Sequence, residues 1–287
     1  MVKTYSRICM ELRSRLAALE PETALPVSRE LTAKAAGKTV EELLRDLDLF
    51  APDSTAQMAE EYLEEYLAGR PLAYILGEWS FYGLPMKVTE DVLIPRDDTT
   101  AVTDLALEAL SAMEKPRTLD LCTGSGCIGI AIAKRVPAAW VTLADLSDAA
   151  LGIARENAAR NGVSRRVNVV RADALRKPPG FLSGFDLIVS NPPYITGEEM
   201  GQLDVSVREY EPHLALFGGE GGLDFYAICL NYRDSLKPDG YLCFEFGLGQ
   251  EQAVSEILQV NGFGELRFRR DASNIIRAVI ARKMERN

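Results

Sequence analysis

Apolar side chains in the first 70 residues recur at three- and four-residue spacing, the period of an amphipathic helix. The first stripe consists of Tyr5, Ile8, Leu12, Leu16 and Leu19. Further helices are predicted over residues 27–36, over residues 40–49, and from Asp53 or Ser54 to about Gly69 with a stripe of Met58, Tyr62 and Tyr66. Gly37 is expected to end the second helix, and Thr39 with Glu42 matches a capping box before the third. Short helices cannot bury their apolar faces singly, so we expect a small bundle.

Between residues 70 and 96 the pattern changes to short β-like runs separated by Gly77, Gly83 and Pro85. The runs cover residues 73–76, 79–82, 86–88 and 92–94. They predict a β-hairpin that links the bundle to the rest of the chain. Asp97-Asp98-Thr99-Thr100 is then a helix-start signal, and this helix is expected to continue to about Met113.

From Thr118 onward strands and helices alternate, which is typical of a doubly wound parallel sheet. Strands are predicted at residues 118–121, 141–145, 167–170, 185–190 and 240–246, and an antiparallel pair at residues 264–269 and 275–281. Helices are predicted from Cys127, from Ser147 to Gly162, within residues 221–236, and over residues 251–260. The chain is thus expected to contain a helical bundle at residues 1–70, a β-hairpin linker at residues 71–96, and an α/β domain at residues 97–287 with a seven-stranded, mainly parallel sheet.

The composition is that of an ordinary soluble globular protein, with 47% hydrophobic and 26% charged residues among 287. A formal net charge of −10 gives no overall field that attracts phosphate backbones, which disfavours nucleic acid as a partner. The five cysteines form no Cys-x-x-Cys pair, and the single histidine, His213, argues against histidine triads and multi-histidine metal sites. No window is long and apolar enough for a signal peptide or membrane span, so we expect a cytoplasmic protein without a metal.

The strongest chemical signal is the end of the predicted strand at residues 185–190, which continues as Asn191-Pro192-Pro193-Tyr194. Two prolines remove two backbone donors and fix φ twice, so the chain must leave the sheet in one rigid shape. An amide, two proline carbonyls and a tyrosine ring are thereby presented at the carboxyl edge of the sheet, where ligands bind in open α/β folds. An ordinary proline-terminated strand end would show the same residues. Taken alone, the tetrapeptide supports at most a planar NH₂ group as ligand.

A second signal is the glycine turn in Asp120-Leu121-Cys122-Thr123-Gly124-Ser125-Gly126, between the first predicted strand and its helix. Glycines there let a ligand approach backbone N–H groups at a helix N-terminus. Gly124, Gly126 and Gly129 match Gly-x-Gly-x-x-Gly, and Asp145 could bind the ribose diol of either a dinucleotide or S-adenosylmethionine. Asp120 favours S-adenosylmethionine, because an acid there neutralises the ammonium group of this ligand and would repel the pyrophosphate of a dinucleotide.

The pattern Asp-x-x-Thr-Gly-Ser-Gly followed by Asn-Pro-Pro-Tyr resembles the class I, Rossmann-like methyltransferases that use S-adenosylmethionine to methylate planar amide or amino nitrogens. Other segments narrow the resemblance: Leu-Ala-Tyr-Ile-Leu-Gly at residues 72–77, Val-Leu-Ile-Pro-Arg at 92–96, and Tyr-Glu-Pro at 210–212 leading to Gly-Leu-Asp at 222–224. Together with the helical N-terminal region they resemble the PrmC/HemK family, the protein-(glutamine-N5) methyltransferases of peptide chain release factors. The resemblance runs over nearly the whole chain.

The resemblance implies methyl transfer from S-adenosylmethionine to the glutamine of the Gly-Gly-Gln motif in class I release factors, with S-adenosylhomocysteine as product. We expect a monomer whose N-terminal bundle docks the substrate. Asn191 and the Pro192 carbonyl would accept the two N–H bonds of the substrate amide, and the Tyr194 ring would pack on the amide plane, with Pro193 and Glu211 also binding substrate. The implied cofactor-binding residues are Asp120, Cys122, Thr123, Gly124, Ser125, Gly126, Asp145, Leu146, Asp173, Ala174 and Asn191.

Two positions depart from the family pattern, which usually reads Pro-Glu-Thr-Glu where this chain has Asp97-Asp98-Thr99-Thr100. Asp98 can replace the first acid, but Thr100 replaces the second. The family also often places a larger residue after the third strand's acid, where Ala174 follows Asp173. We interpret both changes as tuning of the pocket.

Two alternative functions are open. An adenine or cytosine amino-methyltransferase of nucleic acid uses the same tetrapeptide, although the negative charge and the lack of a basic recognition domain argue against it. A non-catalytic S-adenosylmethionine-binding docking module would have no use for acceptors aimed at an NH₂ group. The glycines from Gly218 to Gly222 are interpreted either as the hinge of a lid or as an ordinary exposed turn.

Overall fold

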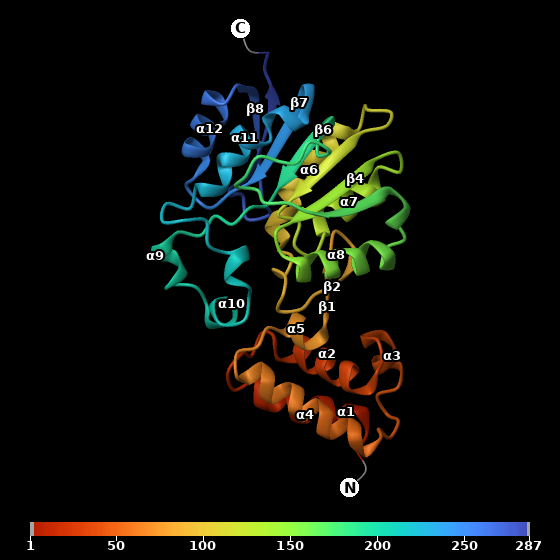
Figure 1. Ribbon diagram of the computed structural model, residues 1–287. Coiled ribbons are helices and arrows are strands. Elements are labelled where there is room, and N and C mark those ends of the chain that lie inside the picture. Colours follow the sequence, from red (N-terminus) through yellow and green to blue (C-terminus); the bar gives the residue numbers. More distant parts are fainter. Residues whose placement is uncertain (1–2, 286–287) are drawn as a thin grey trace. The chain divides into compact units, whose positions relative to one another are not determined.

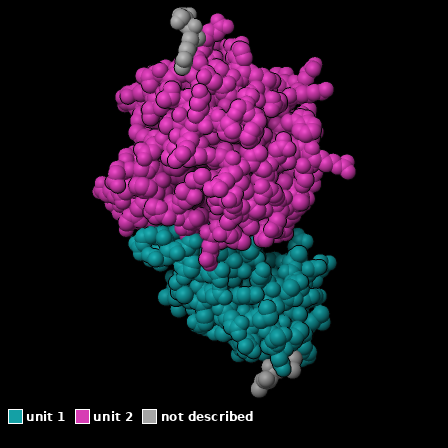
Figure 2. Space-filling view, viewed as in Figure 1, with its two compact units in different colours: residues 1–77, 205–210 teal, residues 78–204, 211–287 magenta. Residues whose placement is uncertain are grey.

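The computed structural model describes residues 3–285, which form two compact units (Figure 2). Unit 1 comprises residues 3–77 and 205–210, and unit 2 comprises residues 78–204 and 211–285. Unit 1 therefore takes in a short segment from much later in the chain. Among the described residues, no helix combines the length and the apolar character needed to cross a membrane.

Unit 1 is built from helices (Figure 1). They are α1 (Tyr5–Leu16), α2 (Ala24–Ala36), α3 (Val40–Arg45), α4 (Asp53–Leu67), α5 (Leu72–Leu76) and, from the later segment, α10 (Val205–Arg208). The apolar faces of α1 to α5 share one core, in which Ile8, Leu31 and Leu63 are buried. α2 ends at Gly37, whose φ is 64°, and the Thr39–Glu42 capping box begins α3. The predicted N-terminal helices are confirmed.

Some details of the prediction for unit 1 are wrong. Residues 73–76 are helical and not β-like, since Ile75 packs into the helical core. α4 begins after Pro52, so neither Asp53 nor Ser54 caps it. Its buried face consists of Thr55, Ala59 and Leu63, whose small members allow close packing, while Met58 is exposed.

Unit 2 begins with the predicted hairpin, in which β1 (Glu78–Phe81) pairs antiparallel with β2 (Leu84–Lys87). Residues 92–94, predicted as a further β-like run, form no strand. The reason is that the Ile94 N–H donates to the Glu211 side chain at 3.2 Å and not to a neighbouring strand.

The centre of unit 2 is a seven-stranded sheet with the strand order β5-β4-β3-β6-β7-β9-β8. Its strands are β3 (Arg117–Leu121), β4 (Trp140–Asp145), β5 (Val167–Arg171), β6 (Phe185–Ser190), β7 (Leu236–Glu245), β8 (Phe263–Arg270) and β9 (Ile276–Lys283). β3 to β7 are parallel, and β9 runs antiparallel to both of its neighbours. The predicted α/β class, strand number and final antiparallel pair are confirmed.

Helices cover both faces of this sheet (Figure 1). α6 (Thr100–Leu110), α7 (Cys127–Arg135) and α8 (Asp148–Arg160) pack on the face that carries Val141, Leu143 and Val189. α11 (Ile228–Asn231) and α12 (Glu251–Val260) pack on the face that carries Ile188 and Phe244. The remaining short elements are α9 (Gly197–Met200) and 3₁₀ turns at Asp97–Thr99, Ser164–Arg166, His213–Ala215, Asp224–Ala227 and Arg233–Ser235.

The helix predicted within residues 221–236 is present but short, because two 3₁₀ turns flank the single turn of α11 there. Tertiary hydrogen bonds decide this shape. The Tyr226 hydroxyl donates to the Glu245 carbonyl at 3.2 Å, and the Tyr232 hydroxyl donates to the Asp173 carbonyl at 3.0 Å.

The sheet register brings three strand ends together. Leu121 at the end of β3 pairs with Ala144 of β4 on one side and with Ser190 of β6 on the other. Asp145 and Asn191 therefore flank the glycine turn that follows β3, at the carboxyl edge where open α/β sheets bind ligands.

Candidate active site

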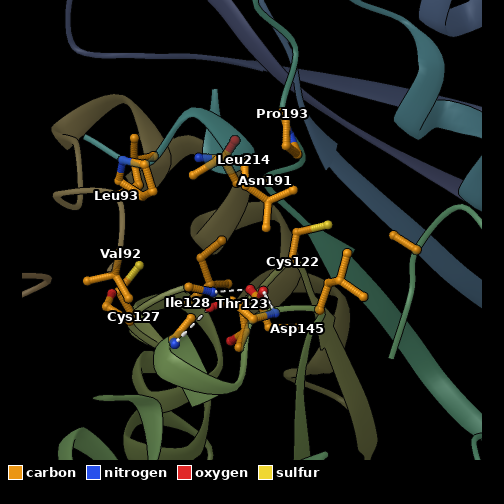
Figure 3. Close-up of a pocket in the computed structure, with 18 of the residues that line it drawn as sticks. Val92, Leu93, Cys122, Thr123, Cys127, Ile128, Asp145, Asn191, Pro193 and Leu214 are labelled. Atoms are coloured by element: carbon orange, nitrogen blue, oxygen red, sulfur yellow. Dashed lines mark hydrogen bonds between the residues drawn. The ribbon is translucent and has the colours of Figure 1, made fainter. Parts of the chain in front are cut away.

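A cavity lies at the carboxyl ends of β3, β4 and β6 (Figure 3). Ten of the residues predicted from the sequence line it, namely Cys122, Thr123, Gly124, Ser125, Asp145, Leu146, Asp173, Ala174, Asn191 and Pro193. The lining does not include Asp120, Gly126, Pro192, Tyr194 or Glu211. In Figure 3, Asn191 and Pro193 lie on one side of Cys122, and Asp145 lies on the other.

The glycine turn is tied to the end of β4 through Asp145. Gly124 N–H donates to Asp145 Oδ2 at 2.9 Å, and Ser147 N–H donates to Asp145 Oδ1 at 3.0 Å. Gly124 has a φ of 53° with open space where a Cβ would stand, as a close ligand approach requires. Each carboxylate oxygen retains acceptor capacity, so Asp145 can still bind the two hydroxyls of a ribose.

Asp120 lies behind this turn and is completely buried. Its Oδ2 accepts from the Thr123 hydroxyl at 2.6 Å and from Gly129 N–H at 2.9 Å. Its Oδ1 has no hydrogen-bond partner in the part of the chain that the structure describes. Burial raises the pKa of Asp120 to about 7, against the lowering effect of those two bonds. The acid therefore supports the turn from inside, and its predicted contact with a ligand's ammonium group stays a prediction.

Gly126 and Gly129 leave no room for a side chain, because the first turn of α7 lies against β4 and α8. A Cβ on Gly129 would stand 2.2 Å from Leu143 Cδ2, and one on Gly126 would stand 2.9 Å from Ile130 Cδ1 and 3.3 Å from Ala154 Cβ. These glycines serve helix–sheet packing, while Gly124 serves ligand access.

Asn191 is held in one orientation by Thr99. Its Nδ2 donates to Thr99 Oγ1 at 3.2 Å, and Thr99 comes from the 3₁₀ turn before α6. Because Nδ2 faces Thr99, the acceptor atom Oδ1 faces elsewhere. Asn191 lines the cavity, and its bond to Thr99 uses Nδ2 and not the acceptor Oδ1.

The rest of the tetrapeptide runs from this cavity to a second hollow. Pro192 is buried, Pro193 lines the first cavity, and Tyr194 lines the second together with Arg96, Asp98 and other residues. The Tyr194 hydroxyl donates to Glu245 Oε1 at 3.4 Å. Burial, and next the nearby Glu245 carboxylate, raise the pKa of Tyr194, so its ring carries a neutral hydroxyl.

Two glycines and one glutamine fix the backbone of the tetrapeptide. A Cβ on Gly218 would stand 2.6 Å from Pro193 O and from Tyr194 Cα, and one on Gly222 would stand 2.4 Å from Tyr194 O. Both glycines are buried, so the structure gives them a packing role and not that of an exposed turn. Gln250 Nε2 donates to the carbonyls of Tyr194 at 3.1 Å and Gly222 at 3.3 Å. Its Oε1 accepts from the backbone N–H of Gly247 at 2.9 Å.

Glu211, predicted to bind substrate, instead holds the segment before α6. It is buried, accepts from Ile94 N–H and forms an ion pair with Arg96. Val92, Leu93 and Pro95 of that segment line the cavity. Glu211 therefore shapes a wall of the site, and a direct substrate contact stays a prediction.

The two residues that depart from the family pattern near the start of α6 each bond to another residue of the chain. Asp98 forms an ion pair with Arg277 at 3.4 Å, and Thr100 Oγ1 donates to the Asp97 carbonyl at 2.6 Å. Thr99, Glu245 and Gln250 were not predicted as site residues. Glu245 interrupts an otherwise apolar run at residues 241–246, which is the one local signal that could have revealed it.

Comparison with known proteins decides the family. Residues 8–77 match the PrmC N-terminal domain and residues 96–208 match the methyltransferase small domain. A release factor glutamine methyltransferase of Bradyrhizobium diazoefficiens is 37% identical over 281 residues, which cover 95% of this chain and 93% of that protein. The chain belongs to the release factor glutamine methyltransferase family.

Other relatives agree. The protein of the same name from Fusobacterium nucleatum is 41% identical over 75% of this chain, and the match spans 60% of that relative's length. The fold alone is shared with the catalytic domain of hMettl16, at a TM-score of 0.56 and 15% identity, covering 82% of this chain and 83% of that one. Membership of this family makes the chain a methyltransferase that uses S-adenosylmethionine.

Proposed function

We propose that this enzyme transfers a methyl group from S-adenosylmethionine to the side-chain amide nitrogen of the glutamine in the Gly-Gly-Gln motif of class I release factors. The relatives that cover most of the chain carry the name release factor glutamine methyltransferase. The observation that carries the proposal is the orientation of Asn191, whose Nδ2 bond to Thr99 leaves Oδ1 as an acceptor at the cavity. An acceptor there matches the N–H bonds of a substrate amide.

The cavity has the donors and acceptors that S-adenosylmethionine needs. We assign the ribose to Asp145, the adenine to the wall formed by Leu146, Asp173 and Ala174, and the methionine part to the turn at residues 122–126. Asp173 is fixed by Leu175 N–H, which donates to its Oδ1 at 2.9 Å. When bound, the cofactor supplies an electrophilic methyl group and leaves as S-adenosylhomocysteine.

The residues of the tetrapeptide would position the nucleophile. An amide nitrogen is a weak nucleophile because its lone pair is delocalised, so alignment is the main contribution available to the enzyme. Asn191 Oδ1 and the Pro192 carbonyl would accept the two N–H bonds and orient the nitrogen toward the methyl group. Acceptors that bind more strongly as positive charge develops on nitrogen favour the transition state over the ground state. The N-protonated product amide is acidic enough to lose its proton to water.

Unit 1 is proposed to dock the release factor. The sequence contains no separate basic recognition domain for nucleic acid, and the net charge of −10 repels phosphate backbones. We therefore propose a protein partner, no direct nucleic-acid contact and a monomeric enzyme.

The proposal is tested by incubating the purified chain with methyl-labelled S-adenosylmethionine and a release factor. Label is expected in the release factor and not in its Gln→Ala variant in the Gly-Gly-Gln motif, because only the glutamine offers the acceptor nitrogen. DNA and RNA serve as parallel substrates. Incorporation into nucleic acid alone would overturn the proposal.

A further inference from the structure

Asn157 is a polar side chain in the interior of unit 2. It lies on α8 and is completely buried, and Ala154 and Ala158 beside it on this helix belong to the hydrophobic core. An amide in such surroundings must find partners for its nitrogen and its oxygen, because an unpaired polar group in the interior costs free energy. The partners of Asn157 therefore show what the residue is for.

The side-chain amide of Asn157 bonds to backbone groups of two separate segments. Its Oδ1 accepts from Lys87 N–H at 2.6 Å, and its Nδ2 donates to the Lys87 carbonyl at 3.0 Å. Nδ2 also donates to the Ser125 carbonyl at 2.9 Å. If the amide turned over, its oxygen would face two carbonyl oxygens, so only one orientation satisfies these partners.

Ser125 belongs to the glycine turn, which forms one wall of the cavity. The peptide group between Ser125 and Gly126 is held at both ends, because its carbonyl accepts from Asn157 and its N–H donates to the Thr123 carbonyl at 2.8 Å. This peptide group directly precedes α7. Its direction therefore fixes the first turn of that helix, where Cys127 and Ile128 line the cavity.

Lys87 is the last residue of β2, and the chain after it forms another wall of the same cavity. Val92 is buried, and its N–H donates to the Thr89 carbonyl at 3.0 Å, which closes a tight turn. A short, packed connection thus joins Lys87 to Val92 and Leu93, which lie across the cavity from Asp145 in Figure 3.

We propose that Asn157 is a positioning residue for S-adenosylmethionine binding, whose single amide holds the glycine turn and the segment after β2 at a fixed spacing. The inference rests on the proposed function, since it takes the turn at residues 122–126 as the binding site of the cofactor. Without the amide, the buried Ser125 carbonyl would lose its partner, and the turn would spend part of its time in other shapes. Affinity falls by the fraction of time that the binding shape is populated.

Asn157→Ala tests the proposal. The dissociation constant of S-adenosylmethionine, measured by calorimetry, should rise about tenfold, because the variant leaves buried backbone groups of both walls unpaired. The melting temperature should also fall, as expected for any loss of buried hydrogen bonds. Unchanged cofactor affinity in a folded Asn157→Ala protein would overturn the positioning role.

Asn161→Ala is the matched control. Asn161 is a second buried asparagine, one helical turn further along, and its Nδ2 donates to the carbonyls of Pro85 and Asn157, each at 3.0 Å. It thus ties α8 to the hairpin and has no described bond to the glycine turn. Asn161→Ala should lower the melting temperature and leave cofactor affinity within about twofold of the wild type. If both variants weaken the cofactor equally, the effect is one of stability and the positioning role is wrong.

Hydrogen exchange of the wild-type protein gives a readout that needs no variant. Coupling between two sites is reciprocal, so a cofactor bound at the turn must also stabilise the bond between Lys87 N–H and Asn157. Saturating S-adenosylmethionine should slow exchange of Lys87 N–H about tenfold, the factor that Asn157→Ala loses in affinity. Trp140 N–H, which donates to the Pro116 carbonyl at 2.9 Å at the other end of β4, is the reference and should change less. Equal changes at Lys87 and Trp140 would overturn the inference even if the variants fail to fold.

These experiments contain no release factor, so a failed methylation assay would overturn the proposed substrate and leave their result standing. Asp145→Ala tests the cofactor assignment separately, because it removes the proposed ribose ligand. If Asp145→Ala keeps full affinity for S-adenosylmethionine, the assignment of the cavity is wrong. If Asp145→Ala loses affinity and Asn157→Ala does not, only the positioning role of Asn157 is wrong.

Discussion

Asp120 and Glu245 are two buried acids at the same edge of one sheet, yet they hold different kinds of partner. Asp120, in β3, bonds the Gly129 backbone and the Thr123 hydroxyl of the glycine turn. Glu245, at the end of β7, accepts from the side-chain hydroxyl of Tyr194 at 3.4 Å. Burial raises the pKa of both carboxyl groups to about 7.

The comparison shows how two buried carboxyl groups of similar pKa can respond differently to a change of pH. A backbone N–H cannot reverse its direction, and Asp120 Oδ2 can accept from Gly129 whether or not Oδ1 carries a proton. The hydroxyl that Glu245 binds belongs to Tyr194 of the tetrapeptide, and a hydroxyl can either donate or accept. We therefore expect a change of pH through about 7 to alter the bond to Tyr194 more than the backbone support of the glycine turn.

The largest effect on kcat is expected when the side chain proposed to hold the substrate amide is removed. Asn191→Ala should lower kcat by about 10²- to 10³-fold, the usual cost of losing one preorganised polar group that stabilises a transition state. Calorimetry should show that S-adenosylmethionine still binds. If binding of the cofactor disappears instead, Asn191 belongs chiefly to the cofactor side and the comparison fails.

A smaller effect is expected from displacing the tetrapeptide without changing it. In Gly218→Ala the new Cβ would stand 2.6 Å from Pro193 O and Tyr194 Cα, so the backbone must shift, and we expect kcat to fall by about 10- to 100-fold. Gly221→Ala is the control, because its Cβ would meet no heavy atom within 4 Å. Equal rates in steady-state assays of the two variants would show that the position of the tetrapeptide is not critical.

The smallest effect is expected on the cofactor side. Asp120→Asn replaces charge-assisted hydrogen bonds to the glycine turn by neutral ones, which should weaken S-adenosylmethionine binding about tenfold. Binding of 5′-methylthioadenosine, which lacks the ammonium group, should weaken equally. A loss confined to S-adenosylmethionine would show that Asp120 acts directly on the ammonium group, as its place in the sequence suggested.

Much of the fold could be predicted where local signals agree. The predicted bounds of β6 and α12 coincide with the observed ones, because each is an apolar pattern ended by proline or glycine nearby. Prediction failed where tertiary contacts decide. The segment at residues 221–236 is shaped by tyrosine hydroxyls that reach strand ends, and no periodicity reports those bonds.

The residues of the candidate site also divide into those with a local sequence signal and those fixed by tertiary contacts. Its cavity-lining motifs are contiguous in sequence, so their residue types and spacing were visible before the structure. Thr99 was missed because its partner Asn191 lies 92 residues further along the chain. Glu245 gave only the weak signal of an acid inside an apolar run, and nothing local names Tyr194 as its partner.

Gln250 sets a limit on how this site can be reused in protein engineering. Its single side-chain amide joins the loop after β6, the glycine segment and the loop after β7. The four residues of the tetrapeptide therefore cannot be transferred alone to another protein and keep their shape. A graft onto another parallel sheet would need to carry three separate loops and the glutamine that joins them, or supply a substitute scaffold of the same connectivity.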